Sequence, residues 1–278
     1  MRSSWNAYST SEELRAIRGA AADAVILGSG LAGLADTLDT LARIPYARIP
    51  GFGAPSVDGH PGFVSLNRIA GEPVLILAGR FHAYEGTGVA GLASPVALAA
   101  YAGCARIVVT QAAGSLTRRI SPGTWMLATD AVALPARLVS GLNRAPYRNE
   151  DSRLGRRGAA RIVSERLSSA LRDAARAARV PLADGVLCWT SGPTYETAAE
   201  ARSAALAGAD AATMSSFPEL LAAQSLRMEA ACLSWITNYT AHISGGRTDH
   251  AHVVEMGEAG APMLGAILAA LFRARRAE

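Results

Sequence analysis

The sequence predicts a single α/β domain built on a parallel or mixed β-sheet with helices on both faces. Short apolar runs of strand length alternate with Ala-, Leu- and Arg-rich helical stretches along the chain, which is the pattern of successive strand–helix units. The 278 residues, 50% of them apolar, suffice for one large core. No linker rich in Ser, Gly or Pro interrupts the pattern, so residues 1–278 are assigned to one domain.

The expected strands are runs of aliphatic and β-branched residues bounded by turn residues. They cover Ala24–Gly28, Tyr46–Ile49, Phe63–Ile69, Val74–Ala78, Arg106–Gln111, Trp125–Ala133, Gly185–Thr190, Ala211–Met214 and Ala230–Thr237. The expected helices cover Glu12–Arg18, Leu31–Leu38, Pro95–Ala102, Ala159–Arg179, Thr197–Leu206, Pro218–Arg227 and His250–Ala274. Residues 140–158 are polar and Arg-rich, and are expected to form a long exposed loop.

Arginine supplies all the basic side chains of the chain. All 27 are Arg and none is Lys, which excludes a P-loop lysine, a lysine Schiff base and a lysine general base. The net charge of +4 and the pI of about 9.2 are modest for this length. Most Arg residues stand in helical stretches with Glu and Asp, so we expect solvated helix faces and no nucleic-acid partner.

The sequence carries no signal for a membrane, a leader or a disulfide. No apolar run approaches the ~20 residues of a membrane span, and the first residues, MRSSWN, lack a signal-peptide core. A cytoplasmic location is therefore expected. Cys104, Cys188 and Cys232 are odd in number and lie far apart in apolar runs, which predicts buried free thiols rather than a disulfide or metal site.

The densest group of polar side chains follows the expected strand at Val74–Ala78. Residues 80–85 read RFHAYE, so Arg80, His82 and Tyr84 stand where a buried strand ends, which is where open α/β sheets place their sites. Arg with His suits a small oxyanion such as phosphate, and Tyr with Glu suits a polyol beside it.

A glycine turn follows the first expected strand. Residues 28–33, GSGLAG, match the dinucleotide-binding pattern G-x-G-x-x-G, but that site needs an acidic residue about 20 positions later. Residues 46–53, YARIPGFG, contain none. The simpler interpretation is an anion-binding nest of backbone N–H groups that includes the Ser29 hydroxyl. A tight turn without a ligand is the alternative.

Two further strand ends carry residues suited to an anion. Ala-Ala-Gly at 112–114 lets a ligand approach the backbone, so that the Ala112 amide can donate to an oxyanion. Ser215 can hydrogen-bond an anion, and Met214 beside it offers an apolar surface. Pro218 fits the first turn of the helix that follows.

Two more strand ends suit a planar base. Tyr195 and Glu196 precede a helix that Thr197 can cap, and an aromatic face with a carboxylate suits a base that bears N–H groups. A helix cap with an exposed Glu is the alternative. Asn238 ends the strand at 230–237, and its amide, which both donates and accepts, suits a purine edge, although Asn is also a common turn former.

The histidines do not indicate a metal. His250 and His252 are two residues apart, which does not bring both to one helix face, and neither has a Glu at zinc-protease spacing. We expect one of them to act as a hydrogen-bond donor. His60 is expected in an exposed turn.

Taken in order, these segments resemble the trimeric purine nucleoside phosphorylase family. The matching motifs are ILGSGL at 26–31, GHPG at 59–62, GRFHAYEG at 79–86, VTQAAG at 109–114, GPTYET at 192–197, MSSFPE at 214–219 and ITN at 236–238. The resemblance implies one α/β domain whose central mixed sheet forms a distorted barrel flanked by helices, assembled as a homotrimer.

The resemblance also implies a role for each side chain. Phosphate would be held by Ser29, Arg80, His82, the Ala112 amide and Ser215; the nucleoside would be held by Tyr84, Tyr195, Glu196, Met214, Asn238 and His250. The implied reaction is phosphorolysis of 6-oxopurine nucleosides, with phosphate as co-substrate and neither metal nor cofactor. His82, Glu196 and Asn238 are the implied catalytic residues, with Asn238 stabilising the departing purine.

The sequence departs from the family pattern at three places. Gln111 replaces the usual Asn, adding a methylene expected near the base. Residues 151–159, DSRLGRRGA, stand where the family carries an aromatic into the neighbouring subunit's site, and residues 250–253 read HAHV in place of HEEV. These changes predict that phosphorolysis is retained while the accepted sugar or 5′-substituent has shifted.

Three other functions remain open at this point. A 5′-methylthioadenosine or 5′-methylthioinosine phosphorylase is one, although Asn238 and His250 argue against the adenosine form. A dinucleotide-dependent oxidoreductase built on the glycine turn is the second, and it lacks the ribose acid. A catalytically idle nucleoside-binding protein is the third.

Overall fold

The computed structural model describes residues 8, 11–57, 59–133, 161–246 and 249–276. Nine strands in this part of the chain form one sheet. They are β1 (Asp23–Leu27), β2 (Asp39–Pro45), β3 (Phe63–Ile69), β4 (Glu72–Ala78), β5 (Arg106–Ser115), β6 (Trp125–Val132), β7 (Leu182–Trp189), β8 (Ala211–Thr213) and β9 (Glu229–Tyr239). The helices are α2 (Gly88–Tyr101), α4 (Glu165–Ala177), α5 (Ala198–Leu206), α6 (Phe217–Ser225), α7 (Ala241–Ser244) and α8 (His250–Arg276).

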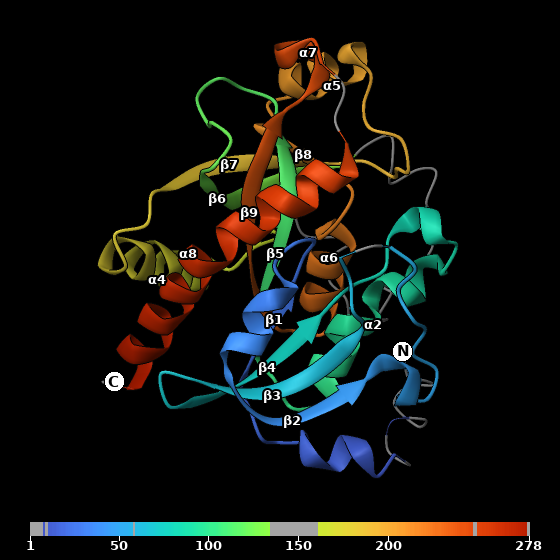
Figure 1. Cartoon of the computed structure of the whole chain (residues 1–278), viewed down its shortest axis with the longest axis vertical. Helices are drawn as coiled ribbons and strands as arrows, with labels where there is room; N and C mark the ends of the chain where they lie inside the picture. The colour runs from blue at the N-terminus through green and yellow to red at the C-terminus, as the bar shows by residue number, and fades with distance from the viewer. Residues whose placement is uncertain (1–7, 9–10, 58, 134–160, 247–248, 277–278) are drawn as a thin grey trace.

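The sheet is mixed and closes on itself through β5. Its order is β2-β3-β4-β1-β5-β8-β7-β6-β9, and β9 returns to pair with β5, so that five strands form a closed ring. Strand β5 is parallel to β1 and β9 and antiparallel to β8, while β6 is antiparallel to β9. Figure 1 shows the ring above the open part of the sheet formed by β1 to β4. The predicted distorted mixed barrel is confirmed.

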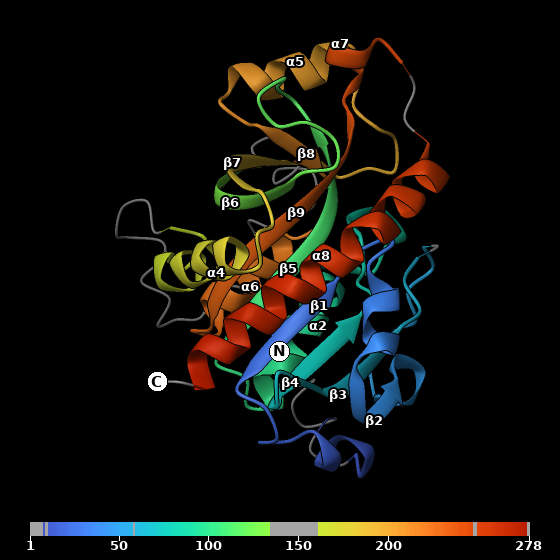
Figure 2. The ribbon, with the colours of Figure 1, turned by 60° about the vertical axis from the view of Figure 1, so that its left-hand side comes forward.

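Alternate side chains of the central strands enter two separate cores, because successive strand residues face opposite sides of a sheet. Ile26 and Leu77 belong to one core, together with side chains of α2 and α6. Val25 and Ile76 belong to the other, together with side chains of α4 and α8. Figure 2 shows α8 and α4 on the same side of the sheet. Burial on both faces explains the continuous apolar runs of these strands.

Strands β1, β4 and β5 run parallel, so their carboxyl ends meet at one edge of the sheet. The register pairs Leu27 with Ala78 and Ile26 with Val109. The residues that follow, Ser29 and Arg80, are therefore brought to the same edge, which is where α/β folds place their sites.

Most expected elements are present, but one expected strand is wrong. Tyr46–Arg48 forms a 3₁₀ turn, and the strand of this region is β2, which precedes it. Most β2 residues are exposed because β2 is an edge strand, so it carries no apolar signal. The expected helices at 12–18 and 31–38 are 3₁₀ segments at Glu13–Ala16 and Ala32–Thr37.

One expected helix begins later than predicted, and two expected segments are not described by the structure. The expected helix at 159–179 begins at Glu165, where the Ser164 side chain accepts the Leu167 N–H. The exposed loop expected at 140–158 and the altered segment 151–159 lie outside the described residues.

Among the described helices, α8 alone is long and apolar enough to cross a membrane by length and composition. Glu255 and Glu258 interrupt its apolar residues, so it contains no continuous apolar run of membrane-spanning length. Its inner face, which includes Leu264 and Ile267, is fully buried in the protein core. A core helix of this length meets the same criteria, so we interpret α8 as part of the core.

Helix α8 touches the loop after β1 through two glycines. A Cβ added to Gly257 would lie 2.5 Å from the Ser29 carbonyl oxygen, and one added to Gly30 would lie 2.3 Å from the Val254 carbonyl oxygen. Gly30 also has a φ of +75°, which side-chain-bearing residues rarely adopt. The contact therefore fixes the Ser29 loop against the helix.

Gly257→Ala is expected to lower the free energy of unfolding by about 1–3 kcal/mol, because the added methyl group displaces backbone. This outweighs the helix-propensity gain of up to about 1 kcal/mol from replacing Gly with Ala. Chemical denaturation measures the change. Gly33→Ala, whose Cβ meets nothing within 4 Å, is the control, and equal stability losses for both variants would contradict the close contact.

Candidate active site

One cavity of about 420 Å³ lies at the sheet edge where β1, β5, β8 and β9 end. Every site residue named from the sequence lines it except Arg80: Ser29, His82, Tyr84, Ala112, Tyr195, Glu196, Met214, Ser215, Asn238 and His250. These residues come from segments more than 200 positions apart. The structure thus brings them together, while the role of each remains a prediction.

His82 and Ser215 form one end of the cavity. The Glu85 carboxylate accepts a hydrogen bond from His82 Nδ1 at 3.0 Å, so that Nε2 of the neutral ring accepts from the Ser215 hydroxyl at 3.2 Å. Burial lowers the pKa of His82, although the bond to Glu85 opposes this shift. A neutral imidazole and two hydroxyls, those of Ser29 and Ser215, therefore face the cavity at this end.

Glu85 holds this end of the cavity in place. Its Oε1 accepts the backbone N–H of His82 at 2.6 Å, and its Oε2 accepts both the backbone N–H and the hydroxyl of Ser56, at 2.9 and 2.8 Å. Burial alone would raise the pKa of Glu85, but the hydrogen bonds from His82 and Ser56 outweigh it and lower the pKa to about 2. Glu85 is an ionised acceptor at neutral pH.

The expectation that His60 is exposed is wrong. Only 7% of its surface is accessible, and its Nε2 lies 3.3 Å from the Ser29 hydroxyl oxygen. Its ring centroid is 5.2 Å from that of His82. Burial, followed by repulsion from His82 and Arg80, places the pKa of His60 well below its ordinary value. The small residues around His60, in the motif GHPG, were the available signal for this close packing.

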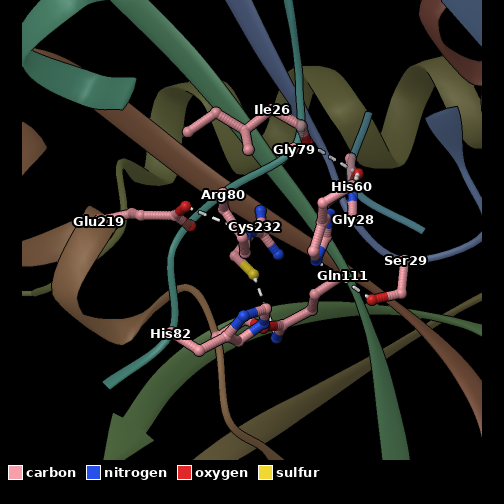
Figure 3. A network of polar contacts seen from close by, with 12 residues as sticks. Ile26, Gly28, Ser29, His60, Gly79, Arg80, His82, Gln111, Glu219 and Cys232 are labelled. Atoms are coloured by element: carbon pink, nitrogen blue, oxygen red, sulfur yellow. Dashed lines mark hydrogen bonds and ion pairs between the residues drawn. The ribbon is translucent and has the colours of Figure 1, made fainter. Parts of the chain in front are cut away.

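Arg80 lies behind the cavity lining, not in it. Its side chain is 1% exposed, and its Nε donates to Oε1 of Glu219 at 3.0 Å. Figure 3 shows this pair beside Cys232 and His60. Glu219 carries no distinctive sequence signal, because a Glu in the first turn of a helix is common.

Gln111 also lies behind the cavity lining and not in it, so its expected place near the base stays a prediction. It is fully buried. Its amide accepts from the Thr213 hydroxyl at 2.9 Å and donates to the Ser234 hydroxyl at 3.0 Å. The longer side chain therefore links β5 to β8 and β9.

The opposite end of the cavity carries an amide and a carboxylate. The Thr237 hydroxyl donates to Oδ1 of Asn238 at 2.8 Å, and Nδ2 of Asn238 donates to the Tyr239 carbonyl at 3.1 Å. Glu196 accepts from the Thr190 hydroxyl at 2.7 Å. The amide and the carboxylate are therefore both oriented by neighbouring groups.

Aromatic and apolar side chains lie between the two ends. Tyr84 stacks on His82 with ring centroids 5.1 Å apart and an interplanar angle of 10°. A Cβ on Gly192 would lie 2.6 Å from both Met214 Sδ and Tyr84, so these two side chains meet over the glycine. Tyr195 is 39% exposed at the cavity mouth. This middle section suits an amphipathic ring such as a sugar.

The site contains no metal-binding cluster within the described residues, where no three His, Cys, Asp or Glu side chains gather around a common point. The three cysteines are buried and free, as predicted. Burial raises the pKa of Cys104 to about 12 and that of Cys232 to about 11, so both are protonated thiols.

Comparison with known proteins places this geometry in a family. The family model described as "Phosphorylase superfamily" matches residues 23–273. Purine nucleoside phosphorylase of Mycobacterium tuberculosis is 36% identical over 247 residues, covering 88% of this chain and 87% of that protein. Purine nucleoside phosphorylase 1 of Geobacillus stearothermophilus is 34% identical over 237 residues, covering 84% of each. The crystal structure of Schistosoma mansoni purine nucleoside phosphorylase with inosine is similar at a TM-score of 0.84 and 25% identity, covering 98% and 96% of the two chains.

Glu85→Gln is expected to lower the free energy of unfolding most at neutral pH. The folded-state pKa of Glu85 is lowered to about 2 from 4.5, so its stabilisation is fully present above the unfolded pKa and is lost as pH falls toward the folded pKa. Denaturant titrations of both proteins at pH 7, 5 and 4 test this. The difference should begin to shrink below about pH 5, and a difference that grows on acidification would contradict the assignment.

Proposed function

The chain belongs to the purine nucleoside phosphorylase family of the phosphorylase superfamily, and on that premise we propose that it catalyses the reversible phosphorolysis of 6-oxopurine ribonucleosides and deoxyribonucleosides. The products are the free base and the sugar 1-phosphate. The observation that carries the proposal is the arrangement of the cavity. Hydroxyls and a histidine face one end, an oriented amide and carboxylate face the other, and aromatic side chains lie between.

The Ser29 and His82 end is the proposed phosphate site. The hydroxyls of Ser29 and Ser215 and the ring of His82 face the cavity, and the Ala112 backbone lines it. All are short or held side chains, so an oxyanion would be bound without ordering long side chains. We assign the positive charge of this site to Arg80, which lies directly behind the lining.

The remaining lining residues form the proposed nucleoside site. Tyr84 and Met214 would contact the ribose, and His250 its 5′-hydroxyl. Tyr195 would lie against the purine face, while Glu196 and Asn238 read its edge. The orientation of Asn238 supports this assignment, because the Thr237 hydroxyl bound to Oδ1 and the Tyr239 carbonyl bound to Nδ2 hold the amide in one orientation, with Nδ2 as its donor atom. A donor suits N7 of a departing purine anion.

The proposed chemistry requires no covalent intermediate. Phosphate attacks C1′ as the glycosidic bond breaks, and the electron pair of that bond remains on the purine. Holding phosphate and nucleoside in one cavity converts a bimolecular step into a unimolecular one. Asn238 then stabilises the negative charge that develops on the departing base through a preorganised hydrogen bond, while Glu196 accepts from the N–H edge of the base and holds it in place. Phosphate is the co-substrate, and the proposal includes neither cofactor nor metal.

Homologous structures support purine nucleosides and bases as the substrate class. One neighbour was solved with inosine and another, 26% identical with a TM-score of 0.78, with hypoxanthine, while a Schistosoma mansoni structure was solved with adenosine. The preference for 6-oxopurines is therefore proposed from Asn238. We further propose a homotrimer, which the sequence resemblance implies, and a cytoplasmic location.

A second candidate function is phosphorolysis of a 5′-modified nucleoside such as 5′-methylthioinosine. The residues at the start of α8 favour it. His250 and Val253 line the cavity, and HAHV replaces the expected HEEV there. A changed helix start at the sugar end would alter which 5′-group fits.

The test is phosphate-dependent release of hypoxanthine from inosine, with 5′-methylthioinosine, adenosine and 2′-deoxyguanosine assayed alongside. Release that requires phosphate and favours inosine or deoxyguanosine supports the first candidate. Turnover of the 5′-methylthio compound alone selects the second, and no phosphate-dependent release from any of them would overturn both.

Asn238→Ala is expected to lower kcat for inosine phosphorolysis by about 10²–10³-fold, because it removes a preorganised donor to the leaving base. Steady-state kinetics measure the change. The rise in Tm that phosphate produces should persist in the variant, which shows that the phosphate end is intact. A kcat near that of the wild type would mean that another group reads the base.

A further inference from the structure

Arg80 and Glu219 form an ion pair that is buried on both sides. They are 139 positions apart, and their side chains are 1% and 3% exposed. The pair is made through a single contact, from Nε of Arg80 to Oε1 of Glu219 at 3.0 Å. Arg–carboxylate pairs are frequently bidentate, so this contact uses only part of the guanidinium fork.

The rest of both groups has no protein partner. Nη1 and Nη2 of Arg80 and Oε2 of Glu219 are buried without a hydrogen bond. A buried charged group with unsatisfied hydrogen-bonding atoms is destabilising, so a pair kept only for stability is poorly explained by this geometry. Two unpartnered amino groups of a buried guanidinium are instead suited to an oxyanion.

The amino groups lie on the side of Arg80 that faces the proposed phosphate site. Figure 3 shows them pointing away from Glu219 and toward Gly28 and His60. The charge of Arg80 contributes to lowering the pKa of His60, and Nε2 of His60 lies 3.3 Å from the Ser29 hydroxyl oxygen. Glu219 therefore fixes the back of the guanidinium while its front faces the anion end of the cavity.

The chain couples Glu219 to the cavity through one short turn. Ser215 lines the cavity, and Glu219 follows four residues later in the first turn of α6. Between them, Ser216 has a φ of +58° and precedes α6, and Pro218 lies in the first turn of that helix. The same turn thus places a hydroxyl at the front of the site and a carboxylate behind it.

We propose that Glu219 is a positioning residue that holds Arg80 by Nε and directs its two amino groups at the bound phosphate. This inference rests on the proposed function for the identity of the anion. Since Arg80 lies behind the lining, the direction of its fork decides whether its amino groups reach an anion. Glu219 sets that direction and touches neither substrate.

The first test compares three substitutions at position 219. Glu219→Gln keeps an acceptor for Nε, Glu219→Asp keeps the charge but withdraws the acceptor by one methylene, and Glu219→Leu removes the acceptor at similar volume. Phosphate KM is expected to stay within about 3-fold of wild type for Gln and to rise about 10–100-fold for Leu, with Asp between. Inosine KM should change less than about 3-fold in all three.

A double-mutant cycle shows whether Glu219 acts through Arg80. The increase in phosphate KM caused by Glu219→Leu should largely disappear in an Arg80→Met background, because coupled residues are not additive. Asp23→Asn is the matched control. Asp23 accepts from Arg106 at 2.7 Å and also pairs with Arg275, at the other end of β1, so its loss should lower Tm without raising phosphate KM.

Several results would overturn the inference. They are an equal rise in phosphate KM for Glu219→Gln and Glu219→Leu, additive changes in phosphate KM in the double-mutant cycle, or a rise in phosphate KM for Asp23→Asn. If no nucleoside is turned over, the proposed function fails, and the rise in Tm produced by inorganic phosphate then ranks the same variants. A wild-type Tm that phosphate leaves unchanged would overturn the role of Glu219 as well.

Discussion

The structure depends on the pairing of β5, the strand shared by the open sheet and the closed ring. Its Thr110 hydroxyl donates to the Ile26 carbonyl at 2.8 Å and accepts the Gly28 N–H at 3.3 Å, which fixes the end of β1. A Cβ on Gly28 would lie 2.7 Å from Gln111 Cα, so only glycine allows the strand ends to approach this closely. Beyond this contact, β5 continues as Ala112 to Gly114 in the cavity wall.

A layer of buried polar groups lies behind the cavity and holds its lining residues in position. Gln111 joins three strands through Thr213 and Ser234. Arg80 and Glu219 form a second contact in the same layer, and His60 with Ser29 a third. Fully satisfied buried networks define one arrangement of a core, whereas in this layer Nδ1 of His60, both Nη atoms of Arg80 and Oε2 of Glu219 have no hydrogen-bond partner among the described residues. The polar layer therefore supports the residues of the proposed phosphate site from behind.

The sequence predicted the α/β class, the buried strands and many of the residues that line the cavity, because these depend on local signals. Val74–Ala78 is apolar since it is covered on both faces, and Ser29 and Asn238 stand out because they end such runs. Edge strand β2 escaped prediction because exposure removes the apolar signal. The burial of Gln111 and Glu219 could not be predicted, since burial of a polar side chain depends on partners up to 139 residues away.

The contact between the Ser29 loop and α8 has a consequence for which substrates fit. Gly257 touches the Ser29 backbone, while His250, about 10 Å earlier along the same helix at 1.5 Å per residue, lines the cavity at the proposed sugar end. One rigid helix therefore sets the separation between the anion and the 5′-group of the proposed substrate. On the proposed function, the site would select nucleosides by length as well as by hydrogen bonding. A new 5′-group would be accommodated by changing side chains at 250–253, because moving the helix would also displace the anion loop.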